Sequence, residues 1–316
     1  MNPYQLMLKQ HYVIEATEVT PQQGGWSALA YKVLCDDQHR YFLKVYEKSR
    51  ASTPKWTALI DNYVPIIQWL SQQTSLQGKI PVPLLTRNSK YTCEDKRGIY
   101  QLFEYIDGTT IGNQPLTNIQ IRQLAEIIAE LHRYGADISM STTAIQEDFR
   151  LSFAEQLREM LNKDLHSLPR EVSELVAPYL DILHKLISNL ESISKELQNS
   201  ELSMRLCHTD LHSWNMMQTD QQLVLIDWEG LKLAPVEADL MFLVDKPYFE
   251  SFMEIYLQTH HNFVINENAL RFYQIRRKLE DVYEFMEQIV YDNQEKQERV
   301  DTIRSLKQEL AGIEKG

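Results

Sequence analysis

The stretch that decides the fold is Cys207-His208-Thr209-Asp210-Leu211-His212-Ser213-Trp214-Asn215, followed by Leu223-Val224-Leu225-Ile226-Asp227-Trp228-Glu229. It predicts a loop that carries His-x-Asp-x4-Asn, a short apolar strand, and a second aspartate where that strand ends. The residues between them predict a hairpin that turns at Thr219-Asp220-Gln221-Gln222. An ionised carboxylate at the end of a buried strand needs a cation or several hydrogen-bond donors. The alternative is an ordinary hairpin whose aspartates cap turns.

These residue types suit phosphoryl transfer from ATP, in which one carboxylate lies beside the nucleophilic hydroxyl and other oxygens hold magnesium. Asp210 is the candidate base, and His208 is expected to hold the loop by hydrogen bonds. Asn215 and Asp227 are the candidate Mg2+ ligands, since magnesium prefers hard oxygen donors. GTP in place of ATP stays open.

A grip on the nucleotide is expected from the N-terminal part of the chain. Lys44 lies in an apolar strand, where a lysine facing the interior needs an anion; the alternative is an outward, solvated lysine. Gly24 and Gly25 join two strands and are candidates to lie over the phosphates, although a plain hairpin turn fits them too. Asp61, in the helix expected next, is the candidate partner for Lys44.

Two further functions fit parts of the pattern. His208, Asp210 and His212 form a His-x-Asp-x-His run, which would suit a transition metal and a hydrolase. A catalytically silent nucleotide-binding regulator would keep the same residues. A protein kinase fits less well, because no activation-loop stretch separates Asp227 from Leu233.

The composition narrows the partners. The formal charge of −12 over 316 residues argues against nucleic acid and suits a small cationic molecule. Three scattered cysteines indicate reduced thiols. The sequence shows neither a signal peptide nor an apolar run of membrane-spanning length, so we expect a soluble cytoplasmic protein without a membrane partner. The oligomeric state is not indicated.

The hydrophobic pattern predicts an α+β protein with a β-rich region over 1–106 and a helical region over 107–316. Expected strands cover 12–16, 29–34, 41–46 and 99–105. Expected helices cover 55–71, the segment after a capping box at Thr117 and Gln120, 149–162, 172–199 with a break near Pro178, 247–259, 267–292 and 294–313.

The catalytic stretch and the segment Leu233-Ala234-Pro235-Val236-Glu237-Ala238-Asp239-Leu240-Met241-Phe242 together resemble the aminoglycoside phosphotransferase and choline kinase superfamily. The segment 273–283 is similar to its spectinomycin phosphotransferase branch. The resemblance implies a two-lobed, protein-kinase-like fold, with a small antiparallel sheet lobe that binds nucleotide and a larger helical lobe.

The resemblance also implies roles for individual residues. Lys44 would hold the α- and β-phosphates, and the backbone of Glu104, Tyr105 and Ile106 would hold the adenine. Asp239 would support the catalytic loop. The sequence departs from the family pattern at Asp61, where a glutamate is usual, and in its sparse glycine loop.

The implied substrate is a small cationic molecule with a hydroxyl group, such as an aminoglycoside or aminocyclitol antibiotic, or choline or another amino alcohol. Antibiotic resistance and metabolism both fit as its purpose. Glu280, Asp281 and Glu284 lie on a late helix and are candidates to line an acidic cleft; the alternative is a solvated acidic face. Trp228 is a candidate to stack on the substrate, although core packing fits it as well.

Overall fold

The computed structural model describes residues 2–22, 24, 27–162 and 168–313. The chain packs into two compact units, and each is described by itself. The first unit comprises 1–48, 53–146 and 204–263, and the second comprises 49–52, 147–203 and 264–316. The predicted lobe boundary at residue 106 stays a prediction.

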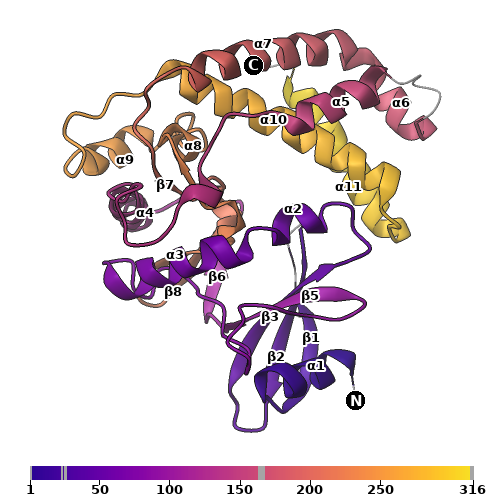
Figure 1. Cartoon of the computed structure of the whole chain (residues 1–316), viewed down its shortest axis with the longest axis vertical. Helices are drawn as coiled ribbons and strands as arrows, with labels where there is room; N and C mark the ends of the chain where they lie inside the picture. Colours follow the sequence, from indigo (N-terminus) through magenta and orange to yellow (C-terminus); the bar gives the residue numbers. More distant parts are fainter. Residues whose placement is uncertain (1, 23, 25–26, 163–167, 314–316) are drawn as a thin grey trace. The chain divides into compact units, whose positions relative to one another are not determined.

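A five-stranded antiparallel sheet opens the first unit, in the order β1-β2-β3-β5-β4 (Figure 1). The strands are β1 (Ala16–Gln22), β2 (Leu29–Cys35), β3 (Arg40–Glu47), β4 (Cys93–Glu94) and β5 (Gly98–Glu104). The expected strands at 29–34, 41–46 and 99–105 are confirmed to within one residue at each end. Four consecutive residues of β3, from Leu43 to Tyr46, are buried, so both faces of this strand are covered.

The N-terminal residues form a helix, and the strand expected over 12–16 is wrong. Helix α1 (Pro3–Tyr12) begins at a capping box. The side chain of Asn2 accepts the backbone N–H of Tyr4, and the side chain of Gln5 accepts the backbone N–H of Asn2. Proline at the first helical position strengthens the start. The helix ends at Val13, which has a left-handed backbone with φ of 60°.

Helix α1 covers one face of the sheet (Figure 1). Its buried Met7 and Leu8 join a cluster that includes Val33, Leu43 and Leu102 from three neighbouring strands. Burying such side chains is the main favourable contribution to folding. The helix therefore closes a core that the sheet alone would leave open to water.

A helical segment between β3 and β4 follows the prediction for 55–71. It consists of α2 (Thr53–Thr57) and α3 (Ile60–Gln73), and Pro65 lies inside α3. The buried side chains of α3 include Tyr63 and Ile67. Its first turn carries Asp61, which is exposed.

The rest of the first unit holds the motif. Helix α4 (Asn118–Leu131) begins at the predicted capping box of Thr117 and Gln120. The expected hairpin is formed by β8 and β9 and turns between Thr219 and Leu223. The remaining elements are β6 (Gly108–Thr110), β7 (Arg205–Cys207), β8 (Met216–Thr219), β9 (Leu223–Leu225), β10 (Lys232–Ala234), α8 (Glu237–Leu240) and α9 (Phe249–Tyr256).

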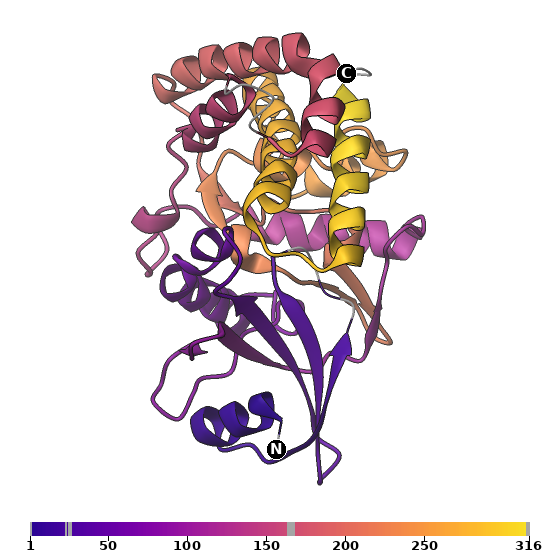
Figure 2. The ribbon, with the colours of Figure 1, turned by 90° about the vertical axis from the view of Figure 1, so that its right-hand side faces the viewer.

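The second unit is helical. Helix α10 packs against α5, α7 and α11, and Figure 2 shows α10 and α11 side by side. The expected break near Pro178 is present as a short 3-10 turn between α6 and α7. The helices are α5 (Ser152–Asn162), α6 (Arg170–Val176), α7 (Leu180–Gln198), α10 (Glu267–Tyr291) and α11 (Lys296–Ile313).

An antiparallel sheet followed by helices confirms the predicted α+β class. Among the residues that the structure describes, no helix combines the length and the apolar composition needed to cross a membrane.

We predict that Leu8→Ala lowers the free energy of unfolding by about 2–5 kcal/mol, because it leaves a cavity between α1 and the sheet. Leu8 is 0% exposed, whereas Leu6 in the same helix is 47% exposed. Leu6→Ala is therefore the matched control, with an expected change within about 0.5 kcal/mol. Urea unfolding measures both, and equal effects of the two substitutions would contradict the packing of α1.

Candidate active site

The loop between β7 and β8 is held through His208. The ring Nε2 lies 2.9 Å from the carbonyl oxygen of Ile226, and Nδ1 lies 3.3 Å from the backbone nitrogen of Asp210. A carbonyl can only accept and an amide N–H can only donate, so Nε2 carries the proton and Nδ1 accepts. The ring thereby connects the loop to the end of β9, as expected from the sequence.

Asp239 supports the same loop by hydrogen bonds. Its carboxylate accepts the backbone N–H groups of His208, at 3.0 Å, and Thr209, at 2.6 Å. His132, just after α4, lies 3.0 Å from the same carboxylate, and its other ring nitrogen lies 2.9 Å from the hydroxyl of Tyr256. All of these side chains are buried, so the loop rests on a network with little access to water.

Asp210 and Asn215 lie together. Asn215 Nδ2 donates to Asp210 Oδ2 at 2.8 Å and to the Asp210 carbonyl oxygen at 3.0 Å. Because the amide nitrogen is used in this way, the amide oxygen of Asn215 is the atom that a hard cation would meet. His212 Nε2 lies 3.3 Å from Asp210 Oδ2.

Asp227 follows β9 with a left-handed backbone, φ 64° and ψ 65°, and begins the 3-10 turn Trp228–Gly230. The preceding Ile226 donates its N–H to the carbonyl oxygen of Asn215 at 3.0 Å, which brings the two candidate metal ligands onto neighbouring strand ends. A left-handed backbone is costly for a residue other than glycine. Here it turns the carboxylate of Asp227 toward Lys44.

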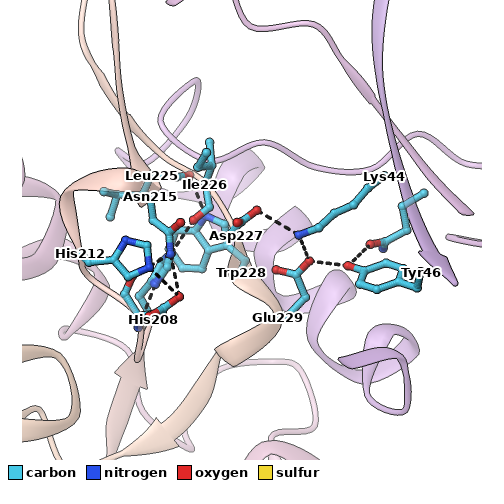
Figure 3. Close-up of polar contacts among 12 residues, drawn as sticks. Lys44, Tyr46, His208, His212, Asn215, Leu225, Ile226, Asp227, Trp228 and Glu229 are labelled. Carbon is cyan, nitrogen blue, oxygen red and sulfur yellow. Dashed lines mark hydrogen bonds and ion pairs between the residues drawn. The ribbon is translucent and has the colours of Figure 1, made fainter. Parts of the chain in front are cut away.

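Lys44 meets two carboxylates (Figure 3). Its Nζ lies 3.0 Å from Asp227 Oδ1 and donates a second hydrogen bond to Glu229, which also accepts the hydroxyl proton of Tyr46. The side chains of Lys44 and Glu229 are 9% and 8% exposed. Lys44 is therefore the buried lysine that needs an anion, and the alternative of a solvated lysine is wrong.

Burial and charge oppose one another in this cluster. Burial lowers the pKa of Lys44, but the carboxylates of Asp227 and Glu229 outweigh it and raise the pKa above its usual value. Burial likewise raises the pKa of Glu229, and the ammonium of Lys44 reverses this and lowers it. Both groups are therefore charged at neutral pH.

The partner expected for Lys44 was wrong. Asp61 is exposed in the first turn of α3, and its short side chain makes no bond with Lys44 among the described contacts. Glu229, which lies 185 residues from Lys44 along the chain, is the partner instead. A signal was present, since Glu229 follows Asp227 by two residues, but nothing local connects it with β3.

Of the two glycines predicted to lie over the phosphates, the structure describes Gly24. Gly25 lies outside the described residues. At Gly24 a Cβ would lie 2.9 Å from the carbonyl oxygen of Ala28, so this close approach of two backbones requires glycine.

The backbone of the predicted adenine segment has a defined direction. Tyr105 donates its N–H to Arg40 in β3 at 3.2 Å, whereas the carbonyl of Leu102 accepts from Leu84 on the other edge. Since backbone groups alternate along a strand, the carbonyl of Glu104, the last residue of β5, points toward that other edge.

The predicted substrate residues have other contacts. Trp228 is 3% exposed, packs on the ring of His208 and donates its indole N–H to Leu225, which excludes direct stacking on a substrate. In the second unit, Glu280 pairs with Arg276 at 3.0 Å and Asp281 with Arg277 at 2.9 Å.

The carboxyl group of Asp281 is also less fully ionised at neutral pH than that of an ordinary aspartate. Its burial, with Glu309 and Glu284 nearby, raises its pKa to about 7 despite the opposing effect of Arg277. The roles of Glu280, Asp281 and Glu284 in substrate binding stay predictions.

The geometry does not favour a transition-metal hydrolase. Both ring nitrogens of His208 are engaged with backbone groups, so this residue is unsuited to ligate a metal with Asp210 and His212. A second group, His132, Cys207 and Asp239, brings its donor atoms within 4.8 Å of one another. There the histidine and the carboxylate are already used in hydrogen bonds that support the loop.

The chain was compared with known protein families, curated proteins and solved structures. The model of the phosphotransferase enzyme family, APH, matches residues 18–273. No curated protein gave a match.

Solved structures of small-molecule kinases share the fold over their whole length. Spectinomycin phosphotransferase APH(9)-Ia, in complex with ADP and spectinomycin, has a TM-score of 0.76 at 21% identity and covers 98% of this chain and 97% of its own. Choline kinase LicA from Streptococcus pneumoniae has a TM-score of 0.62 at 15% identity and covers 98% of both chains. ADP-bound aminoglycoside phosphotransferase APH(2'')-Ib has a TM-score of 0.55 at 19% identity and covers 99% of both. The likeness confirms the kinase-like fold.

We predict that Gly230→Ala destabilises the first unit. A Cβ there would lie 2.5 Å from Thr209 Oγ1, which donates a hydrogen bond to the Gly230 carbonyl, and 3.1 Å from the His208 carbonyl oxygen. We expect the free energy of unfolding to fall by about 1–3 kcal/mol, as for an overpacked site.

Gly312→Ala is the control for that substitution, because a Cβ at Gly312 in α11 meets nothing within 4 Å. There we expect no loss and a gain of up to about 1 kcal/mol from helix propensity. Urea unfolding compares the two, and a Gly230→Ala protein as stable as the parent would contradict the tight contact between the turn and the loop.

Proposed function

This chain belongs to the phosphotransferase enzyme family, and we propose that it transfers the γ-phosphoryl group of ATP to a hydroxyl group of an aminoglycoside or aminocyclitol antibiotic. The observation that carries this proposal is the meeting of Asp210, Asn215, Asp227 and Lys44 within one unit. Phosphoryl transfer depends on positioning and on neutralising charge, and these residues supply both.

Asp210 is the proposed catalytic base. Its carboxylate accepts the proton of the acceptor hydroxyl as the oxygen forms its bond to the γ-phosphorus and the bond from that phosphorus to the bridging oxygen of ADP breaks. The amide of Asn215 and the ring of His212 orient the carboxylate through contacts of 2.8 and 3.3 Å. A fixed base of this kind accelerates proton transfer because no rearrangement is needed at the moment of reaction.

Asn215 and Asp227 are the proposed ligands of magnesium. The donor set fits this ion, because an amide oxygen and a carboxylate are both hard donors, and the side chain of Asp227 is 38% exposed. When bound, magnesium neutralises the phosphate charge. Asp227 also accepts a hydrogen bond from Lys44, whose proposed role is to contact the phosphates.

The adenine is proposed to bind along the backbone of Glu104, Tyr105 and Ile106. The direction of the strand end supports this, since the carbonyl of Glu104 points away from β3. Gly24 and Gly25 are the proposed cover over the phosphates. The same backbone contacts would accept GTP less well, because guanine carries a carbonyl oxygen where adenine carries its amino donor.

The net charge of −12 supports a cationic acceptor. The proteins with similar structures named above act on spectinomycin, aminoglycosides and choline, as their names state. Choline or another amino alcohol is therefore the second candidate, favoured by the likeness to choline kinase. Glu280, Asp281 and Glu284 are proposed to attract the cation.

We predict that Asp210→Asn lowers kcat by about 10²–10⁴-fold while ADP binding is retained, because the substitution removes the proton acceptor and keeps the shape. Asp220→Asn is the matched control, since Asp220 is an exposed aspartate in the nearby hairpin turn. The rate is measured as transfer of labelled phosphate from ATP to an acceptor that the parent protein phosphorylates. Undiminished transfer by Asp210→Asn would exclude Asp210 as the base.

We further predict that, with magnesium and labelled ATP or GTP, the protein phosphorylates a cationic member of an acceptor panel. The panel contains aminocyclitols, aminoglycosides, choline and short amino alcohols, with neutral inositol and glucose as controls. Mass spectrometry identifies the product. Transfer to amino alcohols alone would favour the second candidate, and tight nucleotide binding without any transfer, to water included, would favour a silent regulator.

A further inference from the structure

We propose that Glu229 is the residue that positions Lys44 for the nucleotide phosphates, and that helix α3 contributes no charge to this task. The inference rests on the proposed function only in taking Lys44 as a phosphate-binding residue. It assigns Glu229 a positioning role and makes the turn after β9 responsible for both Asp227 and the lysine.

Helix α3 offers no buried counter-charge for Lys44. Within Ile60–Gln73 the only acidic residue is Asp61, which is exposed at the start of the helix. The helix instead buries Tyr63, Ile67 and other uncharged side chains, and it packs against the turn that carries Glu229. The helix therefore packs against the turn without supplying a counter-charge for Lys44.

Two side chains of the sheet hold the carboxylate of Glu229. Lys44 and Tyr46 are two residues apart on β3, so their side chains point to the same face, and both donate hydrogen bonds to Glu229 (Figure 3). Gln101, opposite Lys44 in β5, lies with its Oε1 3.2 Å from the Tyr46 hydroxyl. Glu229 is thus fixed by two donors from one strand.

Asp227 has two proposed partners, Lys44 and the metal ion. Lys44 contacts Asp227 and Glu229, and Asp227 is also the proposed metal ligand. If Glu229 were neutral, the buried ammonium would depend on Asp227 alone, and lysine and metal would compete for the same carboxylate. With Glu229 present, the lysine would keep one anionic partner when Asp227 holds the ion.

The test measures ADP binding by calorimetry in EDTA, where no metal contributes. We expect Glu229→Gln to raise the dissociation constant for ADP about tenfold, and Lys44→Ala to raise it at least as much. In the Lys44→Ala background, Glu229→Gln should have no further effect, because residues that act through one another are not additive. Tyr46→Phe should give a smaller loss, and Asp61→Asn, the matched acidic control, none.

Three outcomes would overturn the proposal. One is a loss of ADP affinity in Asp61→Asn equal to that expected for Glu229→Gln. Another is additive effects of the Lys44 and Glu229 substitutions. The third is ADP binding in EDTA that Glu229→Gln leaves unchanged while it weakens the dependence on added Mg2+, since Glu229 would then be a metal ligand.

The design also separates folding and the proposed function from this inference. Where Glu229→Gln fails to fold, Glu229→Asp keeps the charge on a side chain one methylene shorter, and an intermediate loss of ADP affinity is expected; full retention would count against the proposal. If the parent protein binds ADP in this pattern but phosphorylates no acceptor, the proposed function fails and the role of Glu229 stands.

Discussion

The buried ammonium of Lys44 is the constraint on which the rest of the site depends. A lysine with 9% of its side chain exposed is unfavourable unless anions reach it, and both of its anions come from the turn after β9. The need to pair this charge therefore brings β3 and the end of β9 together. It also explains why Asp227 takes a left-handed backbone, because the strain is repaid by a buried ion pair and by the position of its carboxylate.

A second buried charge, on Asp239, does for the catalytic loop what Glu229 does for the lysine. Asp239 accepts two consecutive backbone N–H groups of the loop and is itself held by His132 at the end of α4. Helix α4 thereby fixes the loop without contributing to its chemistry. The two clusters meet through His208, whose ring contacts Ile226, the residue before Asp227. The hydrogen bonds of His208 consequently join the loop that carries Asp210 to the turn that carries Asp227.

What could be predicted from the sequence was what local spacing encodes. The capping box of Thr117, the break at Pro178, and the spacing of Asp210, Asn215 and the end of β9 all gave elements that the structure confirms. Helix α1 was missed although Asn2 and Gln5 form a capping box, because the apolar residues after it were assigned to a strand.

The partner of Lys44 was missed for a different reason. Glu229 lies 185 residues away along the chain, so no local pattern relates the two. Asp61 was the nearest acidic residue in a helix expected beside the sheet, but its place in the first turn leaves it exposed. Which of two carboxylates reaches a buried lysine is decided by tertiary packing, and a single sequence carries little information about that choice.

The acidic residues of α10 show the same limit from the side of charge. A count of carboxylates overstates the attraction that this helix offers a cation, because Arg276 and Arg277 lie one turn from Glu280 and Asp281 and pair with them. Asp281 is further weakened, since burial raises its pKa to about 7 and leaves part of the population neutral at physiological pH. The number of acidic residues would therefore matter less for selection of a cationic acceptor by this helix than the pairing of each carboxylate. A carboxylate paired with a neighbouring arginine attracts a second cation more weakly than an unpaired one would.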